Sequence, residues 1–313
     1  MKHYFIINPT AGKKDSSKYL VEEIERAFVG VDDYYQIYIT SGPKDATQYV
    51  KAVCETLDQP ATFYACGGDG TINEVVNGII DSPYAHLGIV PVGSCNDFNK
   101  SLPNAPFLDI KSQIEGSVML VDVIKVNDVY TLNVANIGFD ANVSDDCNRI
   151  KGKIGVKLAY NLAIVHNLLW KMKSHARVYV DGEELSDGVF LLMVAANGTN
   201  YGGSYTCAPK AIVNDGLLDF CLVKKVSRFQ FVRFIKYYKD GSHVDHPETK
   251  GLVFYQKAKN IKVIARKPIS VCLDGDDYKM KEIDISVVPN KIKLIIPKNK
   301  SNVKNSSESV SEN

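Results

Sequence analysis

Hydrophobic and polar positions follow two different patterns along this 313-residue chain, and the pattern changes near residue 120. Before that point, short apolar runs typical of buried strands alternate with longer segments whose apolar residues recur three and four positions apart, as on one face of a helix. Alternating strands and helices are typical of a parallel sheet with flanking helices, so we expect an α/β domain over residues 1–120. The predicted strands are 4–7, 35–39, 61–66 and 87–90, and the predicted helices are 15–28, 45–57 and 71–80.

From residue 121 on, the pattern is dominated by strands. Turn pairs such as Asn127-Asp128 and Asp181-Gly182 separate them, which is typical of antiparallel connections. We therefore expect a mostly antiparallel β-sandwich domain over residues 121–287, with a helical insert at 154–170 where the chain becomes apolar on most faces. The predicted strands are 121–126, 130–136, 176–180, 189–195, 218–223, 260–264, 269–273 and 292–296.

A glycine-rich turn, Gly67-Gly68-Asp69-Gly70-Thr71, lies between the predicted strand 61–66 and the helix that follows it. Glycines let backbone N–H groups approach a phosphate, and the N-terminus of a helix favours negative charge. Asp69 would repel a bare phosphate, so the pattern favours a nucleotide whose phosphates carry Mg²⁺. The alternative is a tight strand-to-helix turn with Asp69 near the N-cap.

Two further loops follow strands in the same domain. Asn8-Pro9-Thr10-Ala11-Gly12-Lys13 comes after strand 4–7, and Pro91-Val92-Gly93-Ser94-Cys95-Asn96-Asp97-Phe98 comes after strand 87–90. The ends of parallel strands gather at one edge of the sheet, where such folds bind ligands. The first loop lacks the spacing of a P-loop, and each loop alone is also compatible with ordinary turn chemistry.

Four more motifs lie in the second half of the chain. They are Asn197-Gly198-Thr199-Asn200-Tyr201-Gly202-Gly203, Ala208-Pro209-Lys210-Ala211, Asn214-Asp215-Gly216-Leu217-Leu218-Asp219 and Leu273-Asp274-Gly275-Asp276. With the three loops, and in this order, they resemble the diacylglycerol kinase catalytic-domain family, especially its soluble bacterial lipid kinases. The resemblance implies an NAD-kinase-like nucleotide domain, to which the chain returns at about 288–297, and a β-sandwich domain for the substrate.

The resemblance implies that ATP binds to the loops of the first domain. Backbone N–H groups and the Lys13 charge would hold the phosphates, while Thr71 and Ser94 offer short hydroxyls. Thr40 aligns with a nucleotide-contacting threonine of similar kinases, although its place at a strand end also suits a turn former. The predicted nucleotide-binding set is Asn8, Pro9, Thr10, Ala11, Gly12, Lys13, Thr40, Gly67, Gly68, Asp69, Gly70, Thr71, Asn73, Glu74, Ser94 and Asn96.

Two carboxylates are predicted to be catalytic, Asp69 and Asp276. Asp69 is expected to bind a catalytic Mg²⁺, with Asp97 or Asp122 acting through water. Similar kinases end the motif at 273–276 with a glutamate that serves as general base, whereas this chain has Asp276. A base must reach the acceptor hydroxyl directly or through one water, and Asp is one methylene shorter. A backbone shift or a water bridge must close that gap, or activity is lowered.

A second, structural Mg²⁺ is implied by the resemblance at residues 212–217. Its ligands would be the Asp215 carboxylate and the carbonyls of Ile212 and Leu217. A hard cation prefers oxygen ligands, and Gly216 would let the carbonyls converge. The alternative is a plain Asn-Asp-Gly hairpin turn, which needs no metal.

Composition narrows the possible partners and compartments. The 37 basic and 36 acidic residues give a net charge of +1, so no bulk field attracts nucleic acid. The seven cysteines form no C-x-x-C pair, which argues against a zinc or redox motif and fits a reducing cytosol. We expect a cytoplasmic protein without a signal peptide or membrane span, with a disordered polar tail at 298–313.

The segment 158–170 is apolar on most faces and is followed by Lys171, Lys173, His175 and Arg177. It would suit the wall of an acyl-chain pocket that rests transiently on the inner face of an anionic membrane, and a core-packed helix with a solvated basic end is the alternative. The expected partner is thus a lipid substrate met by peripheral contact. The sequence leaves open whether the chain forms a homodimer.

Together these observations predict an ATP-dependent lipid kinase that transfers the γ-phosphoryl to a lipid hydroxyl, above all that of diacylglycerol. The alternatives are a kinase for another lipid or for a soluble alcohol, and a non-catalytic nucleotide- or lipid-binding homologue, which Asp276 would explain. NAD kinases share Gly-Gly-Asp-Gly-Thr but carry their Asn-Glu pair well downstream. Here Asn73-Glu74 follows at once, which favours a lipid kinase.

Overall fold

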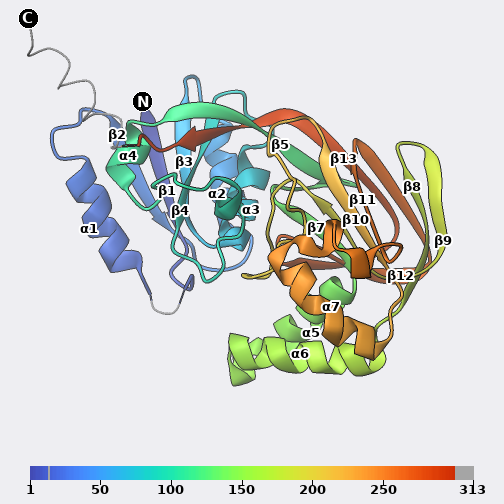
Figure 1. The fold of residues 1–313 in the computed structure, drawn as a ribbon. Coiled ribbons are helices and arrows are strands. Elements are labelled where there is room, and N and C mark those ends of the chain that lie inside the picture. The colour runs from blue at the N-terminus through green and yellow to red at the C-terminus, as the bar shows by residue number, and fades with distance from the viewer. Residues whose placement is uncertain (13–14, 300–313) are drawn as a thin grey trace, which may run out of the picture. The chain divides into compact units, whose positions relative to one another are not determined.

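The computed structural model describes residues 1–12 and 15–299 and divides into two compact units (Figure 1). The first unit consists of Met1–Leu120 and of the chain from Ile292 onward. The second consists of Val121–Lys291. The chain therefore leaves the first unit once and returns to it once.

The first unit contains a parallel sheet with helices between its strands. The strands are β1 (Lys2–Ile7), β2 (Tyr34–Ile39), β3 (Ala61–Gly67) and β4 (Ala85–Pro91), in the spatial order β4-β3-β1-β2. The end of β13 (Asp276–Ile296) adds a parallel neighbour to β4. The helices are α1 (Ser17–Ala27), α2 (Asp45–Cys54), α3 (Asp69–Ile79) and the short α4 (Ile110–Ile114), with a 3₁₀ turn at Phe98–Ser101. The alternating α/β pattern predicted from sequence is confirmed, while α4 and the 3₁₀ turn were not predicted.

Burial explains why these runs form strands at the centre of the first unit. Every residue of β3 is buried, as expected for a parallel strand covered on both faces. On one face of the sheet, Phe5 and Ile7 of β1 pack with Leu20 and Ile24 of α1. The carboxyl ends of β1, β3 and β4 consequently open at one edge, each followed by one of the three loops.

The second unit is built mainly from antiparallel strands, as predicted. Its strands are β6 (Val129–Thr131), β7 (Val134–Gly138), β8 (Ser174–Val180), β9 (Glu183–Ala196), β10 (Leu218–Lys224), β11 (Val253–Ala258), β12 (Asn260–Leu273), most of β13 and the larger part of β5 (Ser117–Val126), which begins in the first unit. Their spatial order is β11-β10-β9-β7-β12-β13, with β8 pairing to β9 and β12, and β5 pairing to β6 and β13.

Three details of the second unit differ from the sequence-based expectation. The predicted strand 130–136 is two strands, β6 and β7, and the predicted strands 260–264 and 269–273 are one strand, β12, whose register shifts between Ile264 and Ile269. The strand β11 and residues 276–291 of β13 were missed. In β11 the apolar run is only three residues long, and in residues 276–291 apolar residues are interspersed with charged ones, so a search for longer apolar runs does not detect either segment.

Helices α5 (Phe139–Ile154), α6 (Val156–Trp170) and α7 (Arg228–Asp240) gather beside the sheet of the second unit (Figure 1). Only α6 was predicted, as the insert 154–170. Two 3₁₀ turns, Ser242–Val244 and Pro247–Thr249, follow α7. Over residues 1–12 and 15–299, none of the helices combines the length and apolar character needed to cross a membrane.

Candidate active site: phosphate loops and an apolar pocket

The glycine turn after β3 begins the helix α3. Gly68 is the N-cap, and Asp69 is the first helical residue, two positions earlier than predicted. A β-carbon on Gly93 would lie 2.3 Å from the Gly68 α-carbon, so the loop after β4 passes against this turn backbone to backbone. The Gly93 N–H donates to the Gly67 carbonyl at 3.0 Å. Only glycine permits this approach, which leaves backbone N–H groups near the helix N-terminus for an anion.

The loop after β1 joins the same edge. The Asn8 side-chain amide donates to the Thr71 hydroxyl at 3.0 Å, and the Asn8 backbone N–H donates to the Cys66 carbonyl. Gly12 has φ +83°, and a β-carbon there would lie 2.6 Å from the Val92 carbonyl oxygen. The three predicted loops therefore meet at one edge of the first unit's sheet. Lys13, assigned to the phosphates, lies outside the described residues.

Asp69 and Asp97 form the acidic centre of this edge. The Asp69 Oδ1 atom accepts the backbone N–H groups of Asp97 at 2.7 Å and of Phe98 at 3.3 Å. Burial and the nearby Asp97 charge raise the pKa of Asp69. Asp97 is almost fully buried, and the Lys100 ammonium lies 2.5 Å from its carboxylate. A cation bound to Asp69 would favour the charged form of this carboxylate and so lower its pKa.

The donor set at this edge fits Mg²⁺. In proteins Mg²⁺ takes one or two carboxylates and completes its shell with water and substrate phosphates. Asp69 supplies such a carboxylate, whereas Asp97, already paired with Lys100, could act on the metal only through water. Within the two described stretches, 1–12 and 15–299, no three His, Cys, Asp or Glu side chains lie together so as to hold a metal by themselves. A metal here would therefore rely on phosphate and water oxygens.

Other predicted nucleotide residues have identifiable contacts in the first unit. Thr40 is buried at the end of β2, and its N–H donates to the Ile7 carbonyl. The Glu74 carboxylate accepts the N–H of Lys44, the N-cap of α2, at 3.0 Å, which is a bond between two helices. Asn73 is buried in α3.

The remaining members of that set lie in the loops themselves. Thr10 bonds to the Asn8 side chain through both its N–H and its hydroxyl. The Asn96 amide donates to the carbonyls of Pro91 and Gly93, which holds the third loop in shape, and Ser94 is exposed beside it. Pro9 and Ala11 complete the first loop.

In the second unit, the motif at 273–276 divides its two acidic residues between different roles. The Asp274 carboxylate accepts three backbone N–H groups, those of Leu132, Asn133 and Val134, at 2.8–2.9 Å. Asp274 therefore holds β7 in place. Asp276 follows at the start of β13 and is exposed, which leaves it accessible to a substrate.

Asp122, considered as a possible Mg²⁺ partner, has a structural position in the second unit. It is fully buried, and its two carboxylate oxygens accept the N–H groups of Gly216 at 2.7 Å and Asn290 at 2.8 Å. Its own N–H donates to the Val213 carbonyl, and the Asn197 side chain donates to its carbonyl. This network ties the loop 212–217 to β5 and β13 through hydrogen bonds within the chain.

The loop predicted to hold a structural Mg²⁺ contains a competing cation. The Asp215 carboxylate accepts the Leu217 N–H at 3.1 Å through Oδ1, and Oδ2 lies 2.5 Å from the Lys257 ammonium. Ile212 is exposed beside this turn. In this arrangement Asp215 does not fit a divalent ligand, because an ammonium already occupies one oxygen and would repel the metal.

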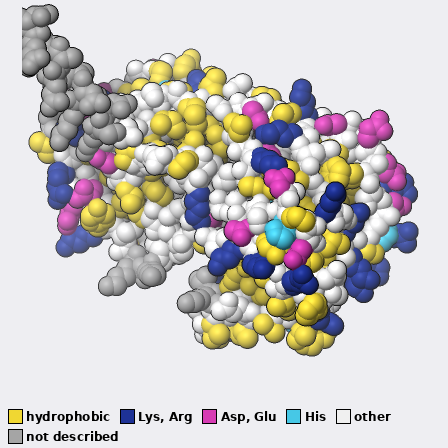
Figure 2. All heavy atoms as spheres, in the orientation of Figure 1, with side chains coloured by type: hydrophobic (Ala, Val, Ile, Leu, Met, Phe, Trp, Pro, Cys, Tyr) yellow, Lys and Arg dark blue, Asp and Glu magenta, His cyan; other side chains and the backbone are white. Residues whose placement is uncertain are grey.

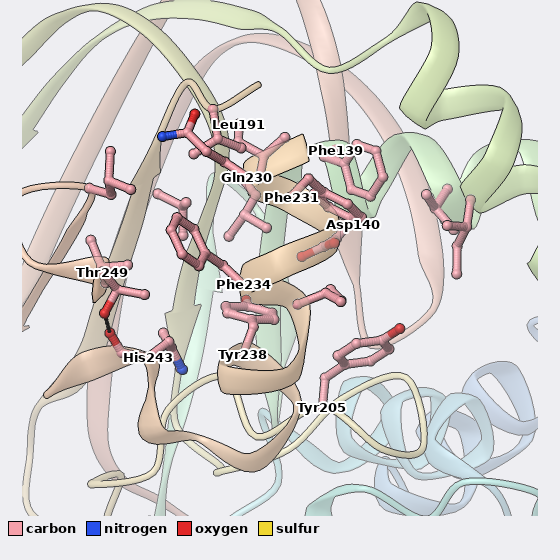
Figure 3. Close-up of a pocket in the computed structure, with 18 of the residues that line it drawn as sticks. Phe139, Asp140, Leu191, Tyr205, Gln230, Phe231, Phe234, Tyr238, His243 and Thr249 are labelled. Atoms are coloured by element: carbon pink, nitrogen blue, oxygen red, sulfur yellow. Dashed lines mark hydrogen bonds between the residues drawn. The ribbon is translucent and has the colours of Figure 1, made fainter. Parts of the chain in front are cut away.

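An apolar pocket lies in the second unit among α5, α6, α7 and the sheet (Figure 3). Aromatic and aliphatic side chains line most of it, and Figure 3 shows Asp140 beside Phe231 within it. The Tyr201 hydroxyl donates to the Asp140 carboxylate, and burial raises the pKa of Asp140 to about 6. The principal lining residues are Phe139, Val143, Tyr160, Ile164, Leu191, Tyr205, Phe231, Phe234, Ile235, Tyr238, Leu252 and Val253.

Sequence reasoning missed most of this pocket because it missed α5 and α7. A signal for α7 was present: Ser227 and Gln230 form a reciprocal capping box at its start. The spacing of Phe231, Phe234 and Tyr238 along α7 also marks one helical face turned to the pocket. Of the predicted insert, Tyr160 and Ile164 contribute to the wall.

Comparison with known proteins identifies the class. Residues 2–126 match the diacylglycerol kinase catalytic domain, and residues 133–296 match the YegS C-terminal NAD kinase beta sandwich-like domain. A diacylglycerol kinase of Bacillus subtilis (strain 168) is 30% identical over 302 residues, covering 94% of this chain and 96% of that protein. One of Staphylococcus carnosus (strain TM300) is 29% identical over 279 residues, or 87% of each chain. The chain belongs to the diacylglycerol kinase family.

Solved structures agree with the fold. A crystal structure from Bacillus anthracis str. Sterne that carries the description diacylglycerol kinase has a TM-score of 0.73 and 26% identity, covering 94% of this chain and 97% of that one. An NAD kinase from Archaeoglobus fulgidus solved with ATP has a TM-score of 0.50 and 15% identity, with 99% and 100% coverage. The predicted pairing of an NAD-kinase-like α/β domain with a β-sandwich-like domain is thereby confirmed.

Proposed function

We propose that this protein is an ATP-dependent lipid kinase that transfers the γ-phosphoryl group of ATP to the hydroxyl of diacylglycerol. The observation that carries the proposal is the pocket of the second unit. Its lining is mostly aliphatic and aromatic, with Asp140, Gln230, His243 and Thr249 as its polar members, and a mostly apolar lining suits an acyl chain. A nicotinamide or sugar acceptor would leave its polar groups unpaired there, at a cost in affinity.

The residues of the first unit would bind and orient the nucleotide. The backbone N–H groups of the turns around Gly12, Gly68 and Gly93 would contact the phosphates. Asp69 would hold Mg²⁺, with Asp97 acting through water. When bound, Mg²⁺ neutralises phosphate charge during phosphoryl transfer. The side chains of Asn8 and Asn96 would hold the loops in shape while the nucleotide enters and leaves, since Asn8 donates to the Thr71 hydroxyl and Asn96 to the Pro91 carbonyl.

Asp276 would act as the general base of the reaction. It is exposed at the start of β13, after a turn in which Asp274 and Gly275 both have positive φ. Because three backbone N–H groups hold Asp274, the turn fixes the backbone position of Asp276. From this position its carboxylate would take the proton of the substrate hydroxyl. A fixed backbone would let Asp276 serve as the base although its side chain is one methylene shorter than the glutamate of similar kinases.

The outer face of α6 would contact the membrane from which the lipid is taken. Leu158, Leu162, Val165 and Leu169 are exposed at helical spacing, and the neighbouring Trp170 is 70% exposed. Figure 2 shows hydrophobic side chains gathered over α6 and the nearby part of α7, with Lys and Arg around them. An apolar stripe bordered by cations is typical of a helix lying in an anionic membrane interface.

The same helix connects this face to the pocket. Tyr160 and Ile164 line the pocket on the inner side of α6. The Arg228 side chain, at the start of α7, donates to the carbonyls of Leu168 and Leu169 at the end of α6. Both helices therefore border the pocket and the exposed face, which would allow a lipid to pass directly from bilayer to pocket.

The proposal is tested by offering purified protein, ATP and Mg²⁺ a panel of acceptors: diacylglycerol, monoacylglycerol, sphingosine, NAD and glycerol. Mass analysis of the products should show phosphorylated diacylglycerol and no phosphorylated NAD or glycerol. Phosphorylation of a soluble acceptor alone would contradict the proposal. ATP binding without any phosphorylated product would indicate a non-catalytic homologue.

Asp69→Asn is the matched variant for this assay. It preserves the shape of the side chain and an oxygen for the Asp97 and Phe98 N–H groups, but removes the charge that would hold Mg²⁺. We expect turnover to fall by about 10²–10³-fold or more, with the melting temperature retained or raised, since burial disfavours the Asp69 charge. Near-normal turnover would show that Asp69 is structural.

A further inference from the structure

A lysine on strand β11 lies between two carboxylates, that of Asp215 in the loop 212–217 and that of Asp219 in strand β10. In the antiparallel pairing of β10 with β11, Lys257 is directly opposite Asp219. Its ammonium lies 3.2 Å from Asp219 Oδ2 and 2.5 Å from Asp215 Oδ2. The pairing of β10 with β11 therefore places the Lys257 ammonium within contact distance of both carboxylates.

Asp219 explains why a cation must be present at this place. Its side chain is only 1% exposed, and an unpaired carboxylate so deeply buried is strongly disfavoured. The Tyr255 hydroxyl donates to Oδ1 at 2.6 Å, and the Lys257 ammonium donates to Oδ2. Among these contacts, only Lys257 supplies positive charge. Removing it would leave a buried charge without compensation.

The same ammonium also serves Asp215. One oxygen of Asp215 accepts the N–H of Leu217, two residues on, which forms the turn, and the other binds Lys257. The loop is closed from its other side by Asp122, which accepts the Gly216 N–H. Each of these contacts is made within the chain. A divalent cation on Asp215 would have to share an oxygen with the ammonium or displace it from Asp219.

We propose that the Lys257 ammonium is the resident cation of this loop and takes the place of a structural divalent metal. The second unit then folds and keeps its shape without Mg²⁺. Any Mg²⁺ requirement of this protein would belong to the nucleotide site of the first unit. The inference does not depend on the proposed lipid kinase activity, because it concerns stability and metal binding alone.

The test is thermal unfolding without nucleotide, in EDTA and in excess MgCl₂, with Asp69→Asn in every protein to remove the metal site of the first unit. The protein with Lys257 intact should melt at the same temperature in both buffers. Lys257→Met should melt several degrees lower in EDTA and regain part of the loss with MgCl₂, since metal binding stabilises only the folded state. Lys257→Arg, which keeps the charge, should remain insensitive to the chelator.

Two results would overturn the proposal. One is a lower melting temperature in EDTA for the protein with Lys257 intact, abolished by Asp215→Asn, because a metal would then be resident on Asp215. The other is a Lys257→Met protein as stable as its parent, because the buried Asp219 would then need no cation. If Lys257→Met does not fold, the chelator comparison between the parent and Asp215→Asn decides the question.

Discussion

At the scale of single residues, Asp140 places a carboxyl group in a mostly apolar pocket. Burial raises its pKa from 3.8 to about 6, although the Tyr201 hydroxyl donates to it. The folded protein therefore binds a proton more tightly than the unfolded chain, and stability is lost as the pH rises from about 3.8 to about 6. Above that range the loss is complete and amounts to about 3 kcal/mol.

Asp140→Asn should remove this pH dependence, because it cannot ionise yet still accepts the Tyr201 hydroxyl bond. We expect urea unfolding of wild type and variant to give similar free energies near pH 4, with the variant more stable by about 3 kcal/mol at pH 7. His243, whose pKa burial lowers to about 4, titrates with the opposite sign but equally in both proteins, so it cancels in the difference. Parallel curves for the two proteins would show that Asp140 is not destabilised by burial.

Sequence reasoning identified the types of residue at the site better than their roles. Asp69 and the glycines around it could be predicted because a strand, a glycine turn and a helix follow one another along the chain. The roles of Asp122 and Asp274 could not, because their partners are backbone groups far away in sequence, such as Asn290 and Leu132. An acidic residue in a motif looks the same whether it binds a ligand or a backbone.

At the scale of elements, the close passage of two loops in the first unit gives a sharp prediction. Gly93→Ala places a methyl group 2.3 Å from the Gly68 α-carbon, which must push the loop after β4 away from the α3 N-terminus. ATP affinity, measured by calorimetry, should fall by at least about tenfold because the backbone donors lose their alignment. Gly42→Ala is the control, since a β-carbon there meets nothing within 4 Å. Equal affinity in both variants would mean that the loops do not form the nucleotide site.

Elements with strong periodicity were predictable, and those defined by pairing were not. The four parallel strands β1–β4 are apolar runs bounded by turns, so each was found within two residues. Strand β13 was found only at its end, because residues 276–291 mix charged and apolar side chains and residues 276–286 are held as a strand by pairing with β12. Helix α7 was missed although the capping box of Ser227 and Gln230 marks its start. Its solvent-facing side carries the exposed apolar residues Phe229 and Val232, so the helix lacks a clear division into an apolar and a polar face.

At the scale of the whole molecule, the exposed face of α6 predicts how the protein meets its substrate. Leu162→Asp with Val165→Asp should reduce sedimentation with phosphatidylglycerol vesicles, because two charges would enter the interface. Turnover of a monomeric short-chain diacylglycerol should stay unchanged, since neither side chain lines the pocket. Val29→Asp, on an 80% exposed site of the first unit, is the control and should leave vesicle binding intact. Loss of turnover on both substrates would show damage to the pocket and not to membrane contact.

The proposed function requires that the chain phosphorylates a lipid with Asp276 in place of glutamate. The measurement is the rate of phosphatidate formation from dioleoylglycerol in anionic mixed micelles, for wild type, Asp276→Asn and Asp276→Glu. We expect a clear wild-type rate, a loss of about 10²–10⁴-fold in Asp276→Asn with ATP affinity unchanged, and an Asp276→Glu rate at or above wild type. A wild type inert beside an active Asp276→Glu would make the natural protein a degenerate kinase, and Asp276→Asn equal to wild type would place the base elsewhere.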